Sequence, residues 1–175
     1  MPTLFEPAAG RRQFLLQWHL TARCEERCRH CYMHDSPSYE SELKNELSPE
    51  ACRQVLDDFT RTVRGWGVEA RINFSGGDPL LRKDLLELVK EASSRGFFVG
   101  ILGNPHLLNE RTARAFKAAG VSRYQLSLDG LEKTHDSLRG RKGAFRDALR
   151  AIRILNKVGL PSVVMFTLSR LNASE

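Results

Sequence analysis

The chain has 175 residues, of which 41% are apolar and 27% are charged, so its composition allows one folded core and argues against a disordered chain. Lys and Arg outnumber Asp and Glu by 27 to 21. The basic residues are dispersed along the predicted helices, with no basic run interleaved with aromatic residues, so nucleic acid is not the expected partner. No apolar run is long enough to cross a bilayer, and the N-terminus has no signal-peptide pattern. We therefore expect a cytoplasmic protein with no membrane partner.

The first predicted elements follow a short tail. Residues 1–12 are predicted as this tail, and residues 13–20 form an aromatic-rich run that is typical of a buried strand. The cysteine-rich segment follows directly, and residues 33–47 are polar and predicted as a loop. Ser48 is a good N-cap and Pro49 suits the first helical position, so the first helix is expected to begin there.

Strands and helices then alternate to the end of the chain. Apolar residues at helical spacing mark three further helices, and short apolar runs between them mark strands. The later helices are predicted around residues 85–92, 109–119 and 145–155. The later strands are predicted at residues 71–75, 97–102, 124–128 and 162–168.

This alternation predicts an α/β fold. Strands joined by helices pair in parallel through right-handed crossovers, and residues 13–175 would then form one domain. A closed eight-stranded barrel needs ~250 residues and is excluded by length. Residues 172–175 have the pattern of a cap for a further helix, so we expect a domain that is incomplete at its C-terminus.

Three of the four cysteines, Cys24, Cys28 and Cys31, form a Cys-x3-Cys-x2-Cys pattern. Such crowding indicates a metal or cluster site in a reducing compartment rather than a disulfide framework. Three thiolates on one loop can bind three irons of a four-iron cluster and leave the fourth iron open to a small molecule.

The alternative interpretation is a structural zinc site in a nucleic-acid-binding module. His19, His30 or Cys52 would then supply the fourth ligand. Cys52, however, shares the apolar face of the first predicted helix, and free cysteine is among the most buried residue types, so we expect it in the core.

Glycines and polar residues follow the later predicted strands. They are Gly76 and Gly77 after the second strand, Asn104 after the third, Ser127 and Asp129 at the end of the fourth, and Arg170 after the fifth. Open α/β sheets bind ligands at the carboxyl ends of their strands, and the cysteine segment follows the first strand at that same edge. The sequence therefore predicts one ligand site along this edge, where the glycines would let the backbone approach a ligand.

These motifs together resemble the radical S-adenosylmethionine (SAM) superfamily. The cysteine pattern is similar to the family's cluster signature, with His30 at its aromatic position, and residues 76–79 resemble the family's Gly-Gly-Glu-Pro motif, with Asp78 in place of Glu. Residues 127–140 resemble the branch of peptide maturases and cofactor-synthesis enzymes that carry an additional C-terminal iron–sulfur domain of the SPASM or twitch type. The resemblance implies a partial (β/α) barrel of the radical SAM type, here truncated after the fifth strand.

The resemblance also implies the activity. Cys24, Cys28 and Cys31 would hold a [4Fe–4S] cluster, and the enzyme would generate a 5′-deoxyadenosyl radical from SAM for hydrogen abstraction from a peptide or cofactor-precursor substrate. An electron donor such as flavodoxin or ferredoxin would supply the electron.

Further roles around SAM follow from the same resemblance. Gly76, Gly77 and Asp78 would contact the methionine ammonium, largely through the backbone, and His30 would flank the adenine or cover the cluster. The methionine carboxylate and the ribose would be bound by the remaining candidates: Ser127 with Arg139 or Arg170 for the carboxylate, and Asp129 for the ribose hydroxyls, unless Asp129 only caps the following turn.

Overall fold

The computed structural model describes residues 12–175, so the predicted tail lies outside the described residues except for Arg12. The described chain forms one five-stranded sheet whose strands all run parallel and lie side by side in the order of the sequence. This arrangement confirms the predicted α/β fold with parallel strands. The strands are β1 (Gln13–Thr21), β2 (Glu69–Gly76), β3 (Phe98–Leu102), β4 (Val121–Ser127) and β5 (Ser162–Met165).

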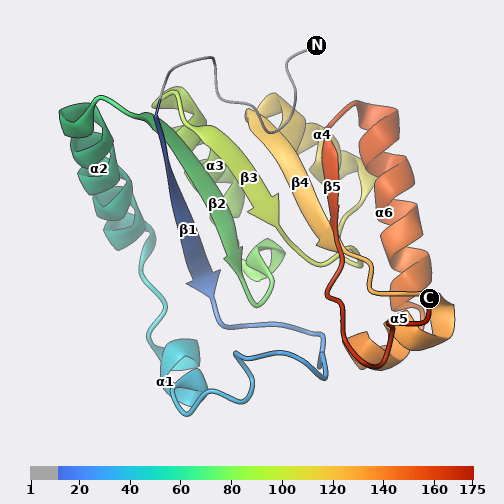
Figure 1. The fold of residues 1–175 in the computed structure, drawn as a ribbon. Coiled ribbons are helices and arrows are strands. Elements are labelled where there is room, and N and C mark those ends of the chain that lie inside the picture. The colour runs from blue at the N-terminus through green and yellow to red at the C-terminus, as the bar shows by residue number, and fades with distance from the viewer. Residues whose placement is uncertain (1–11) are drawn as a thin grey trace.

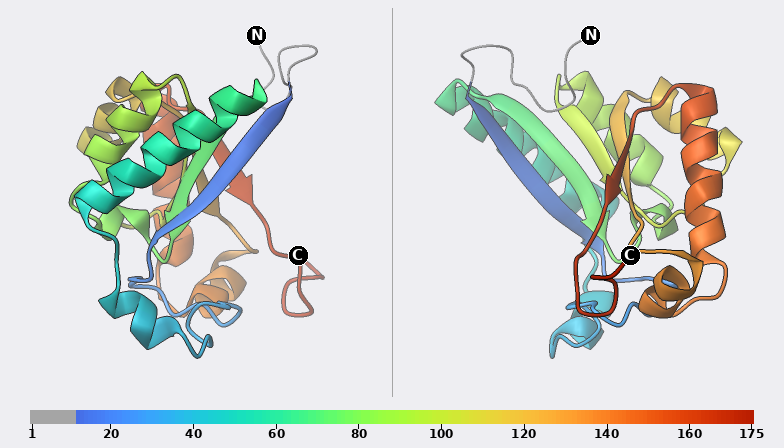
Figure 2. Two further views of the ribbon diagram at one scale, coloured as in Figure 1. Left: turned by 90° about the vertical axis from the view of Figure 1, so that its left-hand side faces the viewer. Right: turned by 45° about the vertical axis from the view of Figure 1, so that its right-hand side comes forward.

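The longer helices connect successive strands and gather on one side of the sheet, as Figures 1 and 2 show. Because each connection from one parallel strand to the next crosses on this side, the sheet curves with its helices outside. These helices are α2 (Pro49–Trp66), α3 (Leu85–Ser94), α4 (Glu110–Ala118) and α6 (Ala144–Val158).

Two short helices and one turn lie beyond the carboxyl ends of the strands (Figure 1). The prediction of a loop over residues 33–47 was wrong for the segment that forms α1. These elements are α1 (Tyr39–Lys44), the 3-10 turn η1 (Pro79–Leu81) after β2, and α5 (Glu132–Arg139) after β4.

The predicted helix starts have a visible local cause. The Ser48 hydroxyl accepts a hydrogen bond from the Ala51 amide at 3.2 Å, and Pro49 occupies the first position of α2. The Asn109 side chain accepts from the Thr112 amide at 2.9 Å at the start of α4. Both caps satisfy amides that have no partner within their own helix.

The core lies between the helices and the sheet. Ile72 and Phe74 of β2 and Ile101 of β3 are fully buried there, and so is Cys52 of α2, as expected from the sequence. Among residues 12–175, no helix is both long and apolar enough to cross a membrane. The helical layer fixes the strands, and the loops at their carboxyl ends carry the polar residues singled out above.

Candidate functional site

The three motif cysteines lie on the loop that leaves β1, here called the cluster loop (residues 22–31). Cys24, Cys28 and Cys31 are half-buried free thiols that line one cavity of about 190 Å³. Gly76 and Gly77, Asn104 and Arg139 line the same cavity from three other segments of the chain, and His30 lines it from the loop itself. The structure therefore brings together the cysteines and the glycine turn, which were predicted to share an edge of the sheet.

The glycine turn after β2 presses against the start of the cluster loop. The Gly77 amide donates to Thr21 O at 2.8 Å, and the Asp78 amide donates to Arg23 O at 2.7 Å. A Cβ on Gly76 would lie 2.2 Å from Thr21 O, and one on Gly77 would lie 2.2 Å from Arg23 O. Backbone packing against Thr21 and Arg23 therefore requires glycine at these two positions, whereas the approach of a ligand was the reason expected from the sequence.

Two polar side chains donate to the cysteine sulfurs. Asn104 Nδ2 lies 3.3 Å from Cys24 Sγ, and Arg139 Nη1 lies 3.6 Å from Cys28 Sγ. Burial raises the pKa of Cys28 to about 11, an effect that Arg139 opposes, and burial also raises the pKa of Cys24. In the metal-free chain these thiols are protonated at neutral pH, so metal binding would release protons.

Asp129 and Arg139 form a buried ion pair beside this cavity. Asp129 is fully buried, its Oδ1 accepts from the Thr167 amide at 2.8 Å, and its own amide donates to His135 Nδ1 at 2.9 Å. The Asn172 side chain donates to the Asp129 carbonyl oxygen at 2.9 Å. Asp129 thus links the end of β4 to the segment after β5, and it orients Arg139 toward Cys28.

Asp78 is fully buried and does not line the cysteine cavity. Its Oδ1 accepts from the Leu80 amide at 3.0 Å and from the Asn104 amide at 3.4 Å. Burial raises the pKa of Asp78 to about 6. The side chain therefore fixes η1 and the loop that carries Asn104, while the backbone of the neighbouring glycines faces the cavity.

The remaining predicted residues are placed differently. His30 lies at the cavity and is exposed, but partial burial of its ring and the charge of Arg139 lower its pKa. Ser127 is half-buried and lines a neighbouring small cavity of about 10 Å³. Arg170 is exposed in the turn after β5 and lines neither cavity.

Two acidic residues have roles that the sequence did not indicate. Glu26 lies within the cluster loop but is only 1% exposed, which a charged residue in a loop does not suggest. Asp136 on α5 accepts the amides of Gly143 at 2.6 Å and Phe145 at 2.8 Å, so it caps α6 from seven residues upstream of Gly143. Neither the burial of Glu26 nor the capping by Asp136 leaves a local sequence signal, because both depend on how α5 packs in the tertiary structure.

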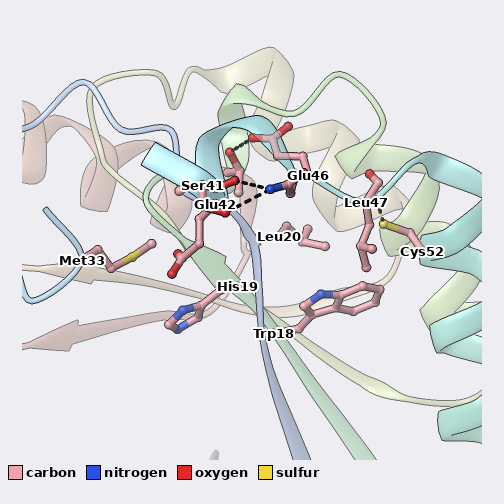
Figure 3. A pocket seen from close by; sticks show the side chains of 12 residues that line it. Trp18, His19, Leu20, Met33, Ser41, Glu42, Glu46, Leu47 and Cys52 are labelled. Carbon is pink, nitrogen blue, oxygen red and sulfur yellow. Dashed lines mark hydrogen bonds between the residues drawn. The ribbon is translucent and has the colours of Figure 1, made fainter. Parts of the chain in front are cut away.

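A second cavity, of about 300 Å³, adjoins the first at the end of β1 (Figure 3). The two cavities share Ala22 and Met33. Figure 3 shows the side chains of Glu46 and Cys52 among those that line it, and Arg23 pairs with Glu46 at 3.3 Å. This ion pair ties the start of the cluster loop to the segment before α2.

The donor set of the cluster loop fits an iron–sulfur cluster. Three free thiols face one cavity, and two of their sulfurs already accept hydrogen bonds from the protein. Within residues 12–175, no three His, Cys, Asp or Glu side chains surround the position of one metal ion. A four-iron cluster makes no such demand, because each cysteine binds a different iron.

Comparison with known proteins gives a consistent assignment. A family model of the radical SAM superfamily matches residues 18–175. Fe-coproporphyrin III synthase of Methanosarcina barkeri is 36% identical over 158 residues, which are 90% of this chain and 38% of that protein. The sporulation killing factor maturation protein SkfB of Bacillus subtilis is 32% identical over 156 residues, which are 89% of this chain and 36% of SkfB. The chain thus spans about two fifths of the length of these curated relatives.

Solved structures share the fold. Streptococcus suis SuiB bound to S-adenosylmethionine has a TM-score of 0.64 at 18% identity, covering 88% of this chain and 33% of SuiB. BtrN in complex with AdoMet and 2-DOIA has a TM-score of 0.60 at 18% identity, covering 87% of this chain and 56% of BtrN. These likenesses confirm the partial barrel expected from the sequence. Because the family model matches most of its length, the chain belongs to the radical SAM superfamily, whose members use a [4Fe–4S] cluster and SAM.

Proposed function

We propose that this chain is the cluster- and SAM-binding core of a radical SAM enzyme that acts on a peptide or a cofactor precursor. The observation that carries the proposal is the single cavity lined by Cys24, Cys28 and Cys31 together with the glycine turn and Arg139. A cluster and SAM held there would supply the one-electron cleavage of SAM to methionine and a 5′-deoxyadenosyl radical for hydrogen abstraction from the substrate.

The chain's own residues prepare the cluster site. Cys24, Cys28 and Cys31 would bind three irons, and they are on a loop fixed to β2 at its start. Asn104 and Arg139 would donate to the bound sulfurs, and such hydrogen bonds are among the factors that set the potential of a cluster. The half-buried position of the thiols would limit the access of water to the cluster.

The same cavity supports a division of roles around SAM. The backbone of Gly76 and Gly77 would face the methionine ammonium, and His30 at the rim would flank the adenine. Of the two arginines considered for the methionine carboxylate, the geometry favours Arg139, because it lines the cavity whereas Arg170 is exposed outside it. Ser127 remains a candidate partner for that carboxylate.

The two buried carboxylates are proposed to act indirectly. Asp78 and Asp129 are fully buried and have no surface toward the cysteine cavity. Asp78 would position Asn104, and Asp129 would position Arg139, through the contacts described above. For Asp129, this proposal replaces the direct contact with the ribose hydroxyls considered from the sequence, and for Asp78 it leaves the expected backbone contact with the ammonium unchanged.

The substrate class is supported by the relatives. They include an Fe-coproporphyrin III synthase and a peptide maturation protein, and SuiB has been solved bound to its precursor peptide SuiA. We propose that the full enzyme acts on a precursor of one of these two kinds, and that a one-electron donor such as flavodoxin or ferredoxin reduces its cluster in the cytoplasm.

The decisive experiment is anaerobic reconstitution of the chain with iron and sulfide, followed by metal analysis. The proposal expects about four irons per chain and cleavage of added SAM to 5′-deoxyadenosine. Replacing Cys24, Cys28 and Cys31 by Ala should abolish iron binding, whereas Cys52→Ala, which removes the buried core cysteine, should leave it intact. Iron retention in the triple variant, or one zinc in place of iron, would refute the proposal.

A further inference from the structure

Glu26 is an acidic residue of the cluster loop whose side chain does not reach solvent. It lies between Cys24 and Cys28 in the sequence, is 1% exposed, and has its Oε2 atom 3.7 Å from Cys28 Sγ. A buried carboxylate is costly unless a positive charge or hydrogen bonds compensate it. Its position therefore requires a partner nearby.

The partner is Arg141, in the turn between α5 and α6. Arg141 Nε lies 3.5 Å from Glu26 Oε1, which is ion-pair distance without the geometry of a hydrogen bond. Arg141 Nη1 also pairs with Asp147 of α6 at 2.8 Å. Arg141 is thus a cation shared by a carboxylate of the cluster loop and a carboxylate of the helix.

The backbone of the cluster loop also contacts the end of α5, and we call this contact between residues 27–29 and residues 138–140 the seam. The Arg29 amide donates to Leu138 O at 2.8 Å. A Cβ on Gly140 would lie 2.4 Å from Arg27 O, so the absence of a side chain there lets the loop lie against the end of the helix. The Glu26–Arg141 pair adds a side-chain contact across this seam.

Glu26 also balances charge at one cluster ligand. The Cys28 sulfur has Arg139 Nη1 at 3.6 Å and Glu26 Oε2 at 3.7 Å, so opposite charges lie at nearly equal distances. Net charge and hydrogen bonds near the sulfurs set the reduction potential of a cluster, and burial leaves such charges poorly screened.

We propose that Glu26 is a positioning residue of the cluster site: its ion pair with Arg141 fixes the cluster loop against α5, and its carboxylate lowers the reduction potential at Cys28. Arg141 offsets part of that negative charge. The inference rests on the proposed function, because the effect on potential requires a cluster bound at Cys28.

The first test measures the midpoint potential of the reconstituted 175-residue chain by an EPR-monitored redox titration. Glu26→Gln should raise the potential, because it removes a negative charge, and Arg141→Gln should lower it, because it leaves that charge uncompensated. Loosening of the loop would shift both in the same direction. Glu50→Gln and Arg146→Gln are matched controls, since these side chains are 74% and 79% exposed and lie outside the cluster loop, and neither should change the potential.

The second test uses the metal-free chain and needs no cluster. Hydrogen–deuterium exchange of the amides of residues 24–31 should become faster in both Glu26→Gln and Arg141→Gln, and should stay at the wild-type rate in the two controls. Asp147 keeps Arg150 at 2.9 Å when Arg141 is replaced, so the start of α6 retains an ion pair.

The outcomes separate this inference from the proposed function. Potential shifts of the same sign in the two variants overturn the electrostatic role of Glu26, and exchange rates equal to wild type overturn its positioning role. A wild-type chain that takes up no cluster overturns the proposed function instead, and the exchange experiment still decides whether the ion pair fixes the loop.

Discussion

Gly77→Ala is the substitution that most directly tests how the cluster loop is positioned. The added Cβ would lie 2.2 Å from Arg23 O, 2.6 Å from Arg23 C and 2.8 Å from Ala22 O. All three atoms are backbone, so no side-chain rotation can relieve the contact. Ordinary contact begins at 3.4 Å, and the turn after β2 must therefore move away from the cluster loop by about 1 Å.

That movement has a cost that can be estimated from the contacts it breaks. The Gly77 amide bonds Thr21 O at 2.8 Å and the Asp78 amide bonds Arg23 O at 2.7 Å, and a shift of this size weakens both. Each bond contributes roughly 1 kcal/mol net, and overpacking adds roughly 1–3 kcal/mol. We expect Gly77→Ala to lower the free energy of unfolding by about 3–5 kcal/mol.

The assay is urea denaturation of the metal-free chain, paired with iron content after reconstitution. Gly65→Ala is the matched control, because Gly65 lies inside α2 with nothing within 4 Å of an added Cβ, and Ala there should be neutral or stabilising by up to about 1 kcal/mol. Gly77→Ala should also lose most of its iron. A variant that unfolds within 1 kcal/mol of wild type and binds the same iron would show that the close approach does not position the loop.

Two further predictions concern the carboxylates of Asp78 and Asp136. Burial raises the pKa of Asp78 to about 6, from an ordinary value near 3.9, so its contribution to stability is complete below about pH 4 and is lost as the pH rises through about 6. The free energy of unfolding should fall by about 3 kcal/mol as a result. Urea denaturation from pH 4 to 8 should show this fall in the metal-free wild type but not in Asp78→Asn. If the stabilities of the two proteins depended on pH in the same way, the raised pKa of Asp78 would be contradicted. Asp136→Ala should destabilise the chain by roughly 1–2 kcal/mol, because the α6 cap is lost. Asp58→Ala, which removes an exposed ion pair with Arg61, is the control and should cost less than about 1 kcal/mol. Equal losses of stability in the same denaturation experiment would argue against the cap.

The sheet and the long helices were predictable because their signals are local. The cap at Ser48 and the cap at Asn109 mark the starts of α2 and α4, and apolar runs mark all five strands. The predicted strand of residues 162–168 was too long, since β5 ends at Met165. Periodicity fails for α1, which buries no residue, and for α5, which buries only His135 and Leu138.

The candidate site was predictable to the extent that its parts lie close together in the sequence. The three cysteines share one loop, and the carboxyl edge of a parallel sheet places Gly76 and Gly77 beside them. The orientation of individual side chains was not predictable. Asp78 turns away from the cavity to bond the Asn104 amide across 26 residues, a contact that only the tertiary fold determines.

The two ends of the cluster loop show why α5, the element with the weakest sequence signal, matters to the site. The loop has no helix or strand of its own, so hydrogen bonds to its neighbours must fix its path. At its start the Asp78 amide bonds Arg23 O, and at its end the Arg29 amide bonds Leu138 O. The first anchor belongs to the turn after β2 and the second to α5, which follows β4 and lies beyond the carboxyl ends of the strands. The loop that carries the cysteines is therefore held at its two ends by the glycine turn and by α5, which are far apart in the sequence. The geometry of the site depends on α5 as much as on the glycine turn.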